Sequence, residues 1–299
     1  MLNYELLVGL KAVIIEGSFE AAAKLLNITP SAISQRIKLL EERLETPLII
    51  RGKPCEATEY GYALFKHAEQ VEVLERNFFS GMPKTTAADA EGAFTLRMAV
   101  NADSMATWFP AAVAKIAGLG NFLFDMVIED EGETAELLRK GDVIAGITSK
   151  KSPIQGFQAS YLGSLRYVSV ASPEYIEKYF PDGIINVITL GRAPSLTFNR
   201  KDKLPSKWSK LVCGRNVNTP TSWIPSLEGY MQACEDGIGW GMHPLNLVNE
   251  QVESGKLVEL VPHSYIDTPL YWQHSVSYGK IMLDISELIV ATSKKQLPQ

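Results

Sequence analysis

The segment Ser18–Leu44 constrains the fold of this chain more than any other, because it has the pattern of two short helices joined by a tight turn. Ser18 can cap an alanine-rich helix, and Asn27–Thr29 connects that helix to one that starts at Pro30. Leucine and valine residues at helical spacing predict one more helix before them, ending near Glu16. Two helices joined by a turn of about three or four residues predict a helix-turn-helix, which is a DNA-binding motif.

The second helix of this pair, Pro30–Leu44, has two chemically different faces. One is an apolar stripe that we expect to be buried, formed by Ile33, Ile37, Leu40 and Leu44. The other is polar and can donate or accept hydrogen bonds through Ser31, Ser34, Gln35 and Lys38. Taken alone, this helix is better explained by an ordinary solvated polar face. The helix before it and the basic segment after it favour contact with DNA, where Gln35 could pair with adenine.

A short β-wing is predicted next. Leu48–Ile50 is β-prone, and Gly52 and Pro54 form a turn whose tip presents Arg51 and Lys53. Beside a helix-turn-helix we expect these two cations at backbone phosphates, with solubilising surface charge as the alternative. The full set of residues expected to contact DNA is Ser18, Thr29, Pro30, Ser31, Ser34, Gln35, Arg36, Lys38, Arg51, Lys53 and Thr58.

A long helix is predicted from Glu59 to about Ser80. Its apolar positions alternate in steps of four and three, which indicates a heptad seam that pairs with a second copy of the chain. The seam consists of Tyr60, Leu64, His67, Val71, Leu74 and Phe78. Packing of this helix against its own domain is the alternative. Gly81, Pro83 and Gly92 then mark a hinge-like linker.

From Phe94 onward, strand patterns alternate with helix patterns. Strands are expected at Phe94–Val100, Phe124–Asp130 and Val143–Ser149, with a helix from about Ser104 after the first. Such alternation predicts parallel sheets with helices on both faces, arranged as two lobes. We therefore predict an α+β multidomain protein in three parts. These are a winged helix-turn-helix in residues 1–58, a linker and dimerisation helix in residues 59–92, and a two-lobed α/β domain in residues 93–299.

Composition narrows the possible functions. The net charge of −5 argues against indiscriminate polyanion binding, yet it allows a local basic surface. No apolar run approaches the roughly 20 residues that span a bilayer, and the N-terminus lacks signal-peptide features, so we expect a cytoplasmic protein with no membrane partner. The three cysteines and four histidines fit no disulfide or zinc pattern. Without a nucleophile motif either, we expect no metal, no cofactor and no enzymatic activity.

Three glycines, Gly237, Gly239 and Gly241, could suggest a loop that holds phosphates. A dinucleotide site needs a strand before such a loop and a helix after it, whereas here a helix precedes and a strand follows. The glycines are therefore expected at a helix end and in a tightly packed strand.

The winged helix-turn-helix, the long helix and the two-lobed domain together resemble the LysR-type transcriptional regulators, over essentially the whole chain. The most specific part is GSFEAAAKLLNITPSAISQRIKLLEERL. The segments IRGKPCEATEYG, VIEDEGETAELLRKGDVIAGI and LYWQ resemble the branch that controls export of arginine or lysine, and Ile49 stands where most of the family has Phe. The resemblance implies a bacterial, nucleoid-associated, sequence-specific regulator that forms homodimers or homotetramers, with RNA polymerase as a further candidate partner.

The resemblance also implies a C-terminal domain like the periplasmic solute-binding proteins, with an effector between the lobes. Asp103 and the acidic run Glu129–Glu133 follow strands, where open α/β sheets place ligands, and their carboxylates suit lysine or arginine. An aromatic or dicarboxylic acid is the rival effector, and a solvated acidic loop is the alternative for the run. Ser104 and Thr148 could receive the effector's carboxylate, although Ser104 could simply cap a helix; Trp223 could wall the pocket or lie in the core. The predicted effector-binding residues are Asp103, Ser104, Glu129, Asp130, Glu131, Thr148 and Trp223.

Overall fold

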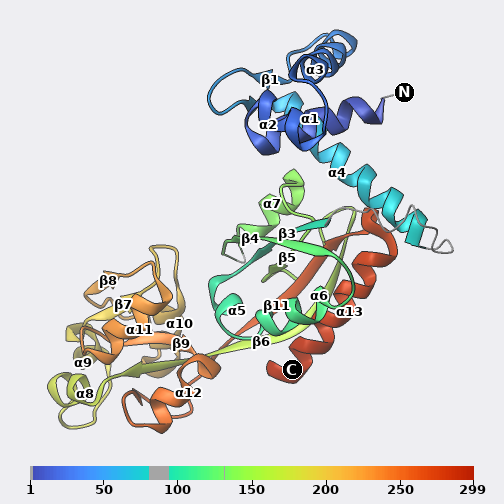
Figure 1. The fold of residues 1–299 in the computed structure, drawn as a ribbon. Helices are drawn as coiled ribbons and strands as arrows, with labels where there is room; N and C mark the ends of the chain where they lie inside the picture. Colours follow the sequence, from blue (N-terminus) through green and yellow to red (C-terminus); the bar gives the residue numbers. More distant parts are fainter. Residues whose placement is uncertain (1–2, 81–93, 131) are drawn as a thin grey trace. The chain divides into compact units, whose positions relative to one another are not determined.

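The computed structural model describes residues 3–80, 94–130 and 132–299 (Figure 1). The predicted linker glycines and proline, together with Glu131, lie outside these ranges. The chain divides into two compact units, one of residues 1–91 and 276–282 and one of residues 92–275 and 283–299. In the described part of the chain, no helix is both long enough and apolar enough to cross a membrane.

The N-terminal unit begins with three helices, α1 (Tyr4–Glu16), α2 (Phe19–Leu25) and α3 (Pro30–Leu44). The predicted caps are confirmed. The Ser18 hydroxyl accepts a hydrogen bond from the Ala21 N–H at 3.0 Å, and the Thr29 hydroxyl accepts one from the Ala32 N–H at 3.2 Å. These caps end the short connections sharply, so the two helices of the motif start where the sequence predicts.

The three helices pack around one apolar core, and this packing leaves one prediction wrong. The core is built from leucine, isoleucine and alanine side chains that are nearly inaccessible to solvent: Leu7, Leu10, Ala22, Ile33, Ile37, Leu40 and Leu48. Leu44, which was expected in the buried stripe of α3, is 40 % exposed. The helix ends at Leu44, and the left-handed backbone of the next residue, Glu45, turns the chain away, so the last turn of α3 has no core to cover it.

The predicted wing is confirmed as a two-stranded antiparallel ribbon, β1 (Ile49–Ile50) and β2 (Glu56–Ala57). It is attached to α3 because the Glu41 carboxylate accepts the Leu48 N–H at 2.8 Å. The following helix, α4 (Glu59–Ser80), packs closely against the residue before this ribbon, Leu48. A Cβ at Gly61 would lie 1.9 Å from the Leu48 carbonyl oxygen, so only glycine fits there.

Helix α4 uses part of its apolar face within its own unit. Leu64 packs against the N-terminal core, and Lys11 of α1 forms an ion pair with Glu72 of α4. The remaining predicted seam positions differ: Tyr60 is 67 % exposed, Leu74 is 54 % exposed, His67 is exposed and Val71 is half-buried. The side chain of Phe78 lies outside the described part. At Leu64, therefore, the helix packs against its own domain, which was the alternative to pairing with a second copy.

The second unit is built on one seven-stranded sheet in the order β10-β6-β11-β5-β3-β4, with β9 also paired to β6. Its first lobe contains β3 (Phe94–Val100), α5 (Ala102–Ala106), α6 (Phe109–Ala117), β4 (Phe122–Ile128), α7 (Thr134–Lys140) and β5 (Ala145–Thr148). Among the described strands of this sheet, only the pairs β3–β4 and β3–β5 are parallel. The prediction of parallel sheets therefore holds for these pairs but is wrong for the rest of the sheet, which is mixed because two long antiparallel strands run through it.

Those two strands are β6 (Phe157–Ala171) and β11 (Ile266–Ser275), and they join the two lobes (Figure 1). One end of β6 pairs with β11 beside the first lobe, and its other end pairs with β9 (Gly241–Pro244) and β10 (Val258–Glu259) of the second. The register shifts next to Gly163, whose φ of +110° and close approach to the C-terminal residues require glycine.

The second lobe adds a parallel pair of strands and a set of helices. The strands are β7 (Ser195–Thr197) and β8 (Thr221–Trp223). The helices are α8 (Pro173–Tyr179), α9 (Val187–Arg192), α10 (Leu204–Cys213), α11 (Leu227–Glu235) and α12 (Leu245–Glu253). The short 3₁₀ helix η2 (Val276–Tyr278) and the long α13 (Gly279–Gln296) complete the chain. The glycines after α11 serve the helix end and β9, as predicted: a Cβ at Gly239 or Gly241 would lie within 3 Å of neighbouring side chains.

One helix differs from its prediction. The helix expected from about Ser104 begins earlier, at Ala102, and is interrupted at Thr107–Trp108 before α6. Asn101 occupies the N-cap position, so the interpretation of Ser104 as the cap is wrong. The break places Trp108 in the core, where it is inaccessible to solvent.

Candidate functional sites: the polar face of α3 and the interlobe cleft

The polar face of α3 carries exposed side chains that bond only to near neighbours in sequence. The Ser31 hydroxyl lies 2.9 Å from the Thr29 hydroxyl. The Lys38 ammonium lies 3.6 Å from a carboxylate oxygen of Glu42, one turn along the helix. Gln35 is exposed between them. Ser34 is half-buried. This face is therefore held in shape by the helix itself and is open to a partner.

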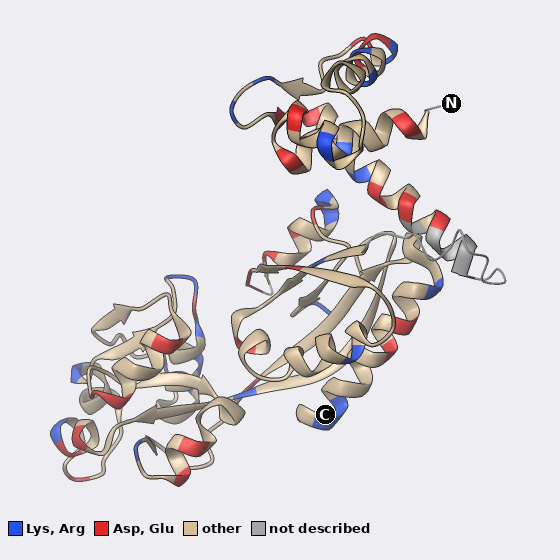
Figure 2. Cartoon of the chain, in the orientation of Figure 1, with Lys and Arg blue, Asp and Glu red and all other residues tan. Residues whose placement is uncertain are grey.

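The wing adds positive charge beside this face. Figure 2 shows lysine and arginine along the loop between β1 and β2. Both Arg51 and Lys53 are exposed, and the Arg51 guanidinium carbon lies 5.5 Å from the centre of the Phe19 ring, which restricts its movement. A cation fixed in this way can contact a phosphate at little cost in side-chain entropy.

Several predicted DNA-contact residues also have a role inside the domain. Ser18 and Thr29 cap α2 and α3, and Pro30 opens α3. The Thr58 hydroxyl donates to the Pro47 carbonyl at 2.8 Å and accepts the Gly61 N–H at 3.0 Å, which joins the wing to α4. Such residues set the position of the reading face.

Arg36, another predicted phosphate contact, packs against α1 of its own domain. Its side chain lies along α1, with its Cδ 3.4 Å from the position a Cβ would take at Gly9, and its guanidinium donates to the Glu5 carbonyl at 3.5 Å.

A cavity of about 620 Å³ lies between the two lobes of the second unit, within the usual range for small-molecule sites. Its first-lobe wall follows the carboxyl ends of β3, β4 and β5, at Asp103, Asp130 and Ser149. Its second-lobe wall is the segment Phe198–Leu204 after β7, together with Tyr230. We refer to this cavity as the cleft.

Charged groups of both signs line the cleft. Among the described residues, the carboxylates belong to Asp103, Asp130, Glu133 and Asp202 and the ammonium groups to Lys201, Lys203 and Lys207, so these carboxylates exceed these cations by one. A ligand with both charges and a net charge of +1 would balance this wall. In the described part of the chain, no group of three or more histidine, cysteine, aspartate or glutamate side chains could hold a metal ion.

Asp103 is the most perturbed of these acids. Burial disfavours its charged form and raises its pKa to about 6, while a hydrogen bond from the Tyr167 hydroxyl at 2.5 Å acts in the opposite direction. The carboxylates of Asp202 and Asp130 raise the pKa of Asp103 further. Burial likewise raises the pKa of Asp202. Both acids would be stabilised in their charged forms by an incoming cation.

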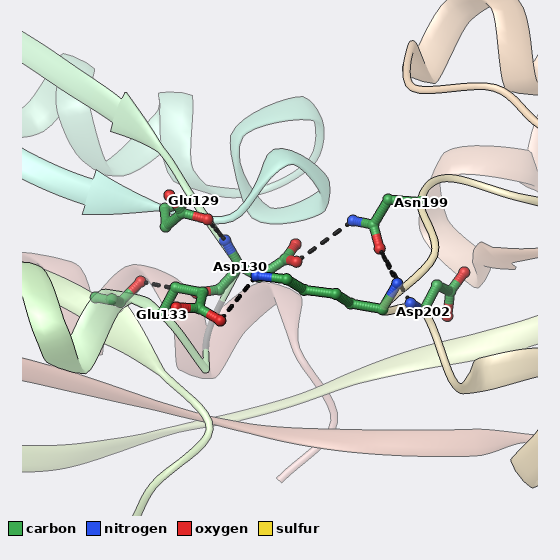
Figure 3. Close-up of polar contacts among 7 residues, drawn as sticks. Glu129, Asp130, Glu133, Asn199 and Asp202 are labelled. Atoms are coloured by element: carbon green, nitrogen blue, oxygen red, sulfur yellow. Dashed lines mark hydrogen bonds and ion pairs between the residues drawn. The ribbon is translucent and has the colours of Figure 1, made fainter.

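Two polar contacts cross the cleft (Figure 3). The Lys201 ammonium lies 2.9 Å from a Glu133 carboxylate oxygen, and the Asn199 side-chain amide donates to Asp130 at 3.3 Å. The first contact lowers the pKa of Glu133 and raises that of Lys201. The segment after β7 therefore already touches the loop after β4, with a lysine ammonium at one of the acids.

The structure brings together only part of the predicted effector set. Asp103 and Asp130 line the cleft, whereas Ser104, Glu129 and Thr148 are not among its lining residues. The Thr148 hydroxyl is buried and engaged with Lys150 and Gln273. Trp223 is 47 % exposed, so the core alternative for it is wrong; it lines a separate hollow of the second lobe.

The residues that the sequence interpretation missed come mainly from one run, Asn199–Lys203, with Tyr167 and Lys207. A signal for them exists. The segment FNRKDK directly follows the short strand β7, and the rule that ligands bind at the carboxyl ends of parallel strands applies to it as it does to Asp103. The contribution of Tyr167 has no such signal, because it lies inside the long strand β6.

Comparison with known protein families assigns both units. Residues 4–62 match the model of the bacterial regulatory helix-turn-helix proteins of the lysR family, and residues 90–276 match the LysR substrate binding domain. The chain belongs to the LysR family. LysR members are DNA-binding transcriptional regulators, which agrees with the motif and the exposed polar face of α3.

Individual relatives are similar over nearly the whole chain. The HTH-type transcriptional regulator ArgP of Pseudomonas fluorescens (strain Pf0-1) is 39 % identical over 298 residues, which cover 99 % of each chain. The regulator LysG of Mycobacterium bovis is 39 % identical over 89 % of this chain and 86 % of its own.

Solved structures of LysR proteins have the same architecture. The crystal structure of ArgP from Mycobacterium tuberculosis is 36 % identical, with a TM-score of 0.79, and covers 100 % of this chain and 99 % of its own. Full-length LysG from Corynebacterium glutamicum with bound effector Arg is 32 % identical, with a TM-score of 0.68 and full coverage of both chains.

Proposed function

We propose that this LysR-family regulator senses a basic amino acid, lysine or arginine, in the cleft and controls genes for its export or metabolism. The surplus of carboxylates in the cleft carries the proposal, and the arginine bound to the similar LysG supports it. Asp103, Asp130 and Asp202 would surround the cationic end of the effector. Lys203 and Lys207 would attract its carboxylate. Lys201 would have to leave Glu133 if the cationic end took that position.

DNA binding is proposed to use α3 as the reading helix. Ser31, Ser34, Gln35 and Lys38 would enter the major groove, and Gln35 would pair with adenine, a contact that typically contributes roughly 1–3 kcal/mol of discrimination. The phosphates would be contacted by Arg36, Arg51, Lys53 and Thr58. The starts of α2 and α3, at the caps Ser18 and Thr29 and at Pro30, would lie near the DNA backbone.

A homo-oligomer is part of the proposal. Two copies paired through the exposed seam positions of α4, Tyr60, His67 and Leu74, would present two reading helices to paired half-sites. The proposed domain limits stay at residues 1–58, 59–92 and 93–299. RNA polymerase remains a candidate partner and the bacterial nucleoid the expected location. The effector would act only through different affinities for two arrangements of this oligomer.

Calorimetry with arginine, lysine, benzoate and succinate tests the effector. We expect saturable binding of arginine or lysine and none of the two acids, because an acid would meet the surplus of carboxylates. Binding of benzoate or succinate in the cleft, with neither basic amino acid bound, would establish the rival class of effector instead.

Selection of DNA from a random pool with the full-length protein gives the operator, and sedimentation at micromolar concentration gives the oligomeric state. A monomer in that run would reject the seam.

A further inference from the structure

A second hollow, of about 410 Å³, lies on the second lobe beside the cleft. It is lined by the ends of the parallel strands β7 and β8, at Thr197 and Trp223, by Arg200, and by the loop Asn216–Thr219. We call it the lobe-two hollow. Asn199 and Asp202 line both this hollow and the cleft, so the segment between them is a wall common to both.

The lobe-two hollow carries a cation without an acidic partner. Among the described residues, no carboxylate lies within ion-pair distance of Arg200, whose guanidinium carbon lies 4.1 Å from the centre of the Trp223 ring. Contact with the indole restricts the guanidinium, and because Arg200 is exposed its N–H groups remain available to a carboxylate, which a guanidinium can bind with two hydrogen bonds.

A buried hydroxyl lines the same hollow. The Thr197 side chain is only 6 % exposed, and its hydroxyl has no hydrogen-bond partner in the described part of the chain. The neighbouring Ser195 hydroxyl, by contrast, lies 2.7 Å from that of Thr219 and 3.0 Å from that of Thr221. A buried hydroxyl left without a partner destabilises a protein, and a ligand atom that reached this one would supply the hydrogen bond that it lacks.

Asp202, the acid in the wall between the two cavities, forms no ion pair with Arg200. Asp202 points one carboxylate oxygen at the Leu204 N–H, 2.8 Å away at the start of α10. Its charge is therefore directed to the helix, and no ion pair with Arg200 forms.

We propose that the lobe-two hollow is a second ligand site, for a small carboxylate that binds Arg200 and the Thr197 hydroxyl and packs its apolar part along Trp223. It is distinct from the effector cleft and opposite to it in charge preference. Because the two cavities share the segment Asn199–Asp202, a carboxylate held there acts on the same segment that carries Lys201 across the cleft. The protein thus responds to two ligands of different class.

Tryptophan fluorescence provides a specific readout. Of the five tryptophans, Trp108, Trp208, Trp240 and Trp272 are inaccessible to solvent and only Trp223 is exposed, at 47 %. Quenching by acrylamide therefore reports on Trp223, and Trp223→Phe should remove the quenchable signal. We expect butyrate, titrated at constant ionic strength, to protect Trp223 from acrylamide with a saturable curve. Saturating arginine should shift the midpoint of that curve by a finite factor without abolishing the protection, because ligands coupled through a shared segment change each other's affinity reciprocally.

Three variants of the full-length protein test the contacts. Arg200→Gln should weaken butyrate binding about tenfold or more, because it removes the charged partner. Arg192→Gln, which removes an exposed arginine of α9 in the same lobe, should leave it unchanged. Thr197→Val should weaken it about two- to fivefold without lowering the melting temperature, since the hydroxyl it removes has no partner in the described part.

Three outcomes would overturn the proposal. Protection that rises without saturation, or equally in Arg200→Gln, would make it a general salt effect. Displacement of butyrate by arginine would make the hollow a part of the effector cleft. A failure of arginine to bind, with butyrate protection intact, would instead reject only the proposed effector and leave this second site standing.

Discussion

The polar face of α3 and the polar wall of the cleft differ in how their side chains are held. On α3 the contacts are local, between Ser31 and Thr29 or between Lys38 and Glu42 one turn away. In the cleft, contacts join residues 64 to 69 positions apart, as in Tyr167 with Asp103 and Asn199 with Asp130. One surface is therefore a property of a single helix, while the other exists only when two lobes are folded against each other.

The difference has a functional consequence. A surface that depends on one helix can keep its shape while its surroundings move, which suits recognition of a regular DNA groove. A surface assembled from two lobes changes when the lobes move, which suits a sensor. The following predictions test this contrast, from the largest expected effect to the smallest.

Asp103→Asn should weaken arginine binding about 30-fold or more. The variant removes a charge from an enclosed site, and loss of one partner of a buried charge pair costs roughly 2–5 kcal/mol. Calorimetry at pH 7.5 measures the change. Glu177→Gln, an exposed change on α8 outside the cleft, is the matched control. Equal affinities of the two variants would show that the cleft acids do not hold the effector's cation.

Ile37→Ala should lower the free energy of unfolding of the N-terminal unit by about 2–5 kcal/mol, because Ile37 is inaccessible to solvent in its core. Gln35→Ala on the exposed side of the same helix should change that free energy by less than about 0.5 kcal/mol. Chemical denaturation of both variants measures the contrast. Comparable losses would mean that the polar face is structural.

Gln35→Ala should relax sequence preference at the base pair it contacts, by roughly 1–3 kcal/mol. Lys53→Ala should instead weaken binding to every sequence alike and reduce the salt dependence, because a phosphate contact carries no sequence information. Titration of the selected operator and of a scrambled duplex, at several salt concentrations, separates the two effects. Parent-like binding by both variants would place the reading face elsewhere.

The pH dependence of protein stability should reveal the raised pKa of Asp103. Its pKa is about 6 in the folded protein, against 3.8 ordinarily, so between these values the folded state holds more protons than the unfolded chain. Stability contributed by this group is therefore lost as pH rises from about 4 to 6, by about 3 kcal/mol. Thermal melts of the parent and of Asp103→Asn should show the variant to be the more stable at pH 7. A variant that melts lower at every pH would contradict this.

Lys201→Met should tighten arginine binding about two- to fivefold, a small effect because the pair with Glu133 is exposed. Lys203 lacks an acidic partner within ion-pair distance among the described residues and is placed at the effector's carboxylate, so Lys203→Met, which removes the same charge from the cleft, should instead weaken arginine binding. Agmatine, which is arginine without its carboxylate, separates the possibilities further. If Lys201→Met weakens arginine binding but not agmatine binding, Lys201 holds the effector's carboxylate and does not compete with its cation.

The N-terminal unit was predictable almost element by element. Ser18, Thr29 and Pro30 define helix starts through contacts within three residues, and Ile33 and Ile37 define a buried face through helical spacing. Leu44 was not predictable in this way, because its exposure depends on where the chain turns after α3. The family resemblance, based on the same segment, was confirmed by both family models.

The cleft was predictable only in part. Asp103 and Asp130 could be located because they directly follow strands, and strand ends are visible in a sequence. Asn199 and Lys201 follow the short strand β7, and nothing local shows that this strand lies opposite the loop after β4. Thr148 also follows the strand-end rule, yet its hydroxyl is taken up by Lys150 and Gln273.

The sequence by itself determined the helices, their caps, the wing and the family, because these depend on spacing and on contacts between residues close along the chain. The tertiary structure decided the mixed sheet, in which β6 and β11 run antiparallel through both lobes. It also decided which acids face one another across the cleft and where Arg200 meets Trp223. Those arrangements join distant parts of the chain, and strand pairing over such separations is set by packing of the whole domain.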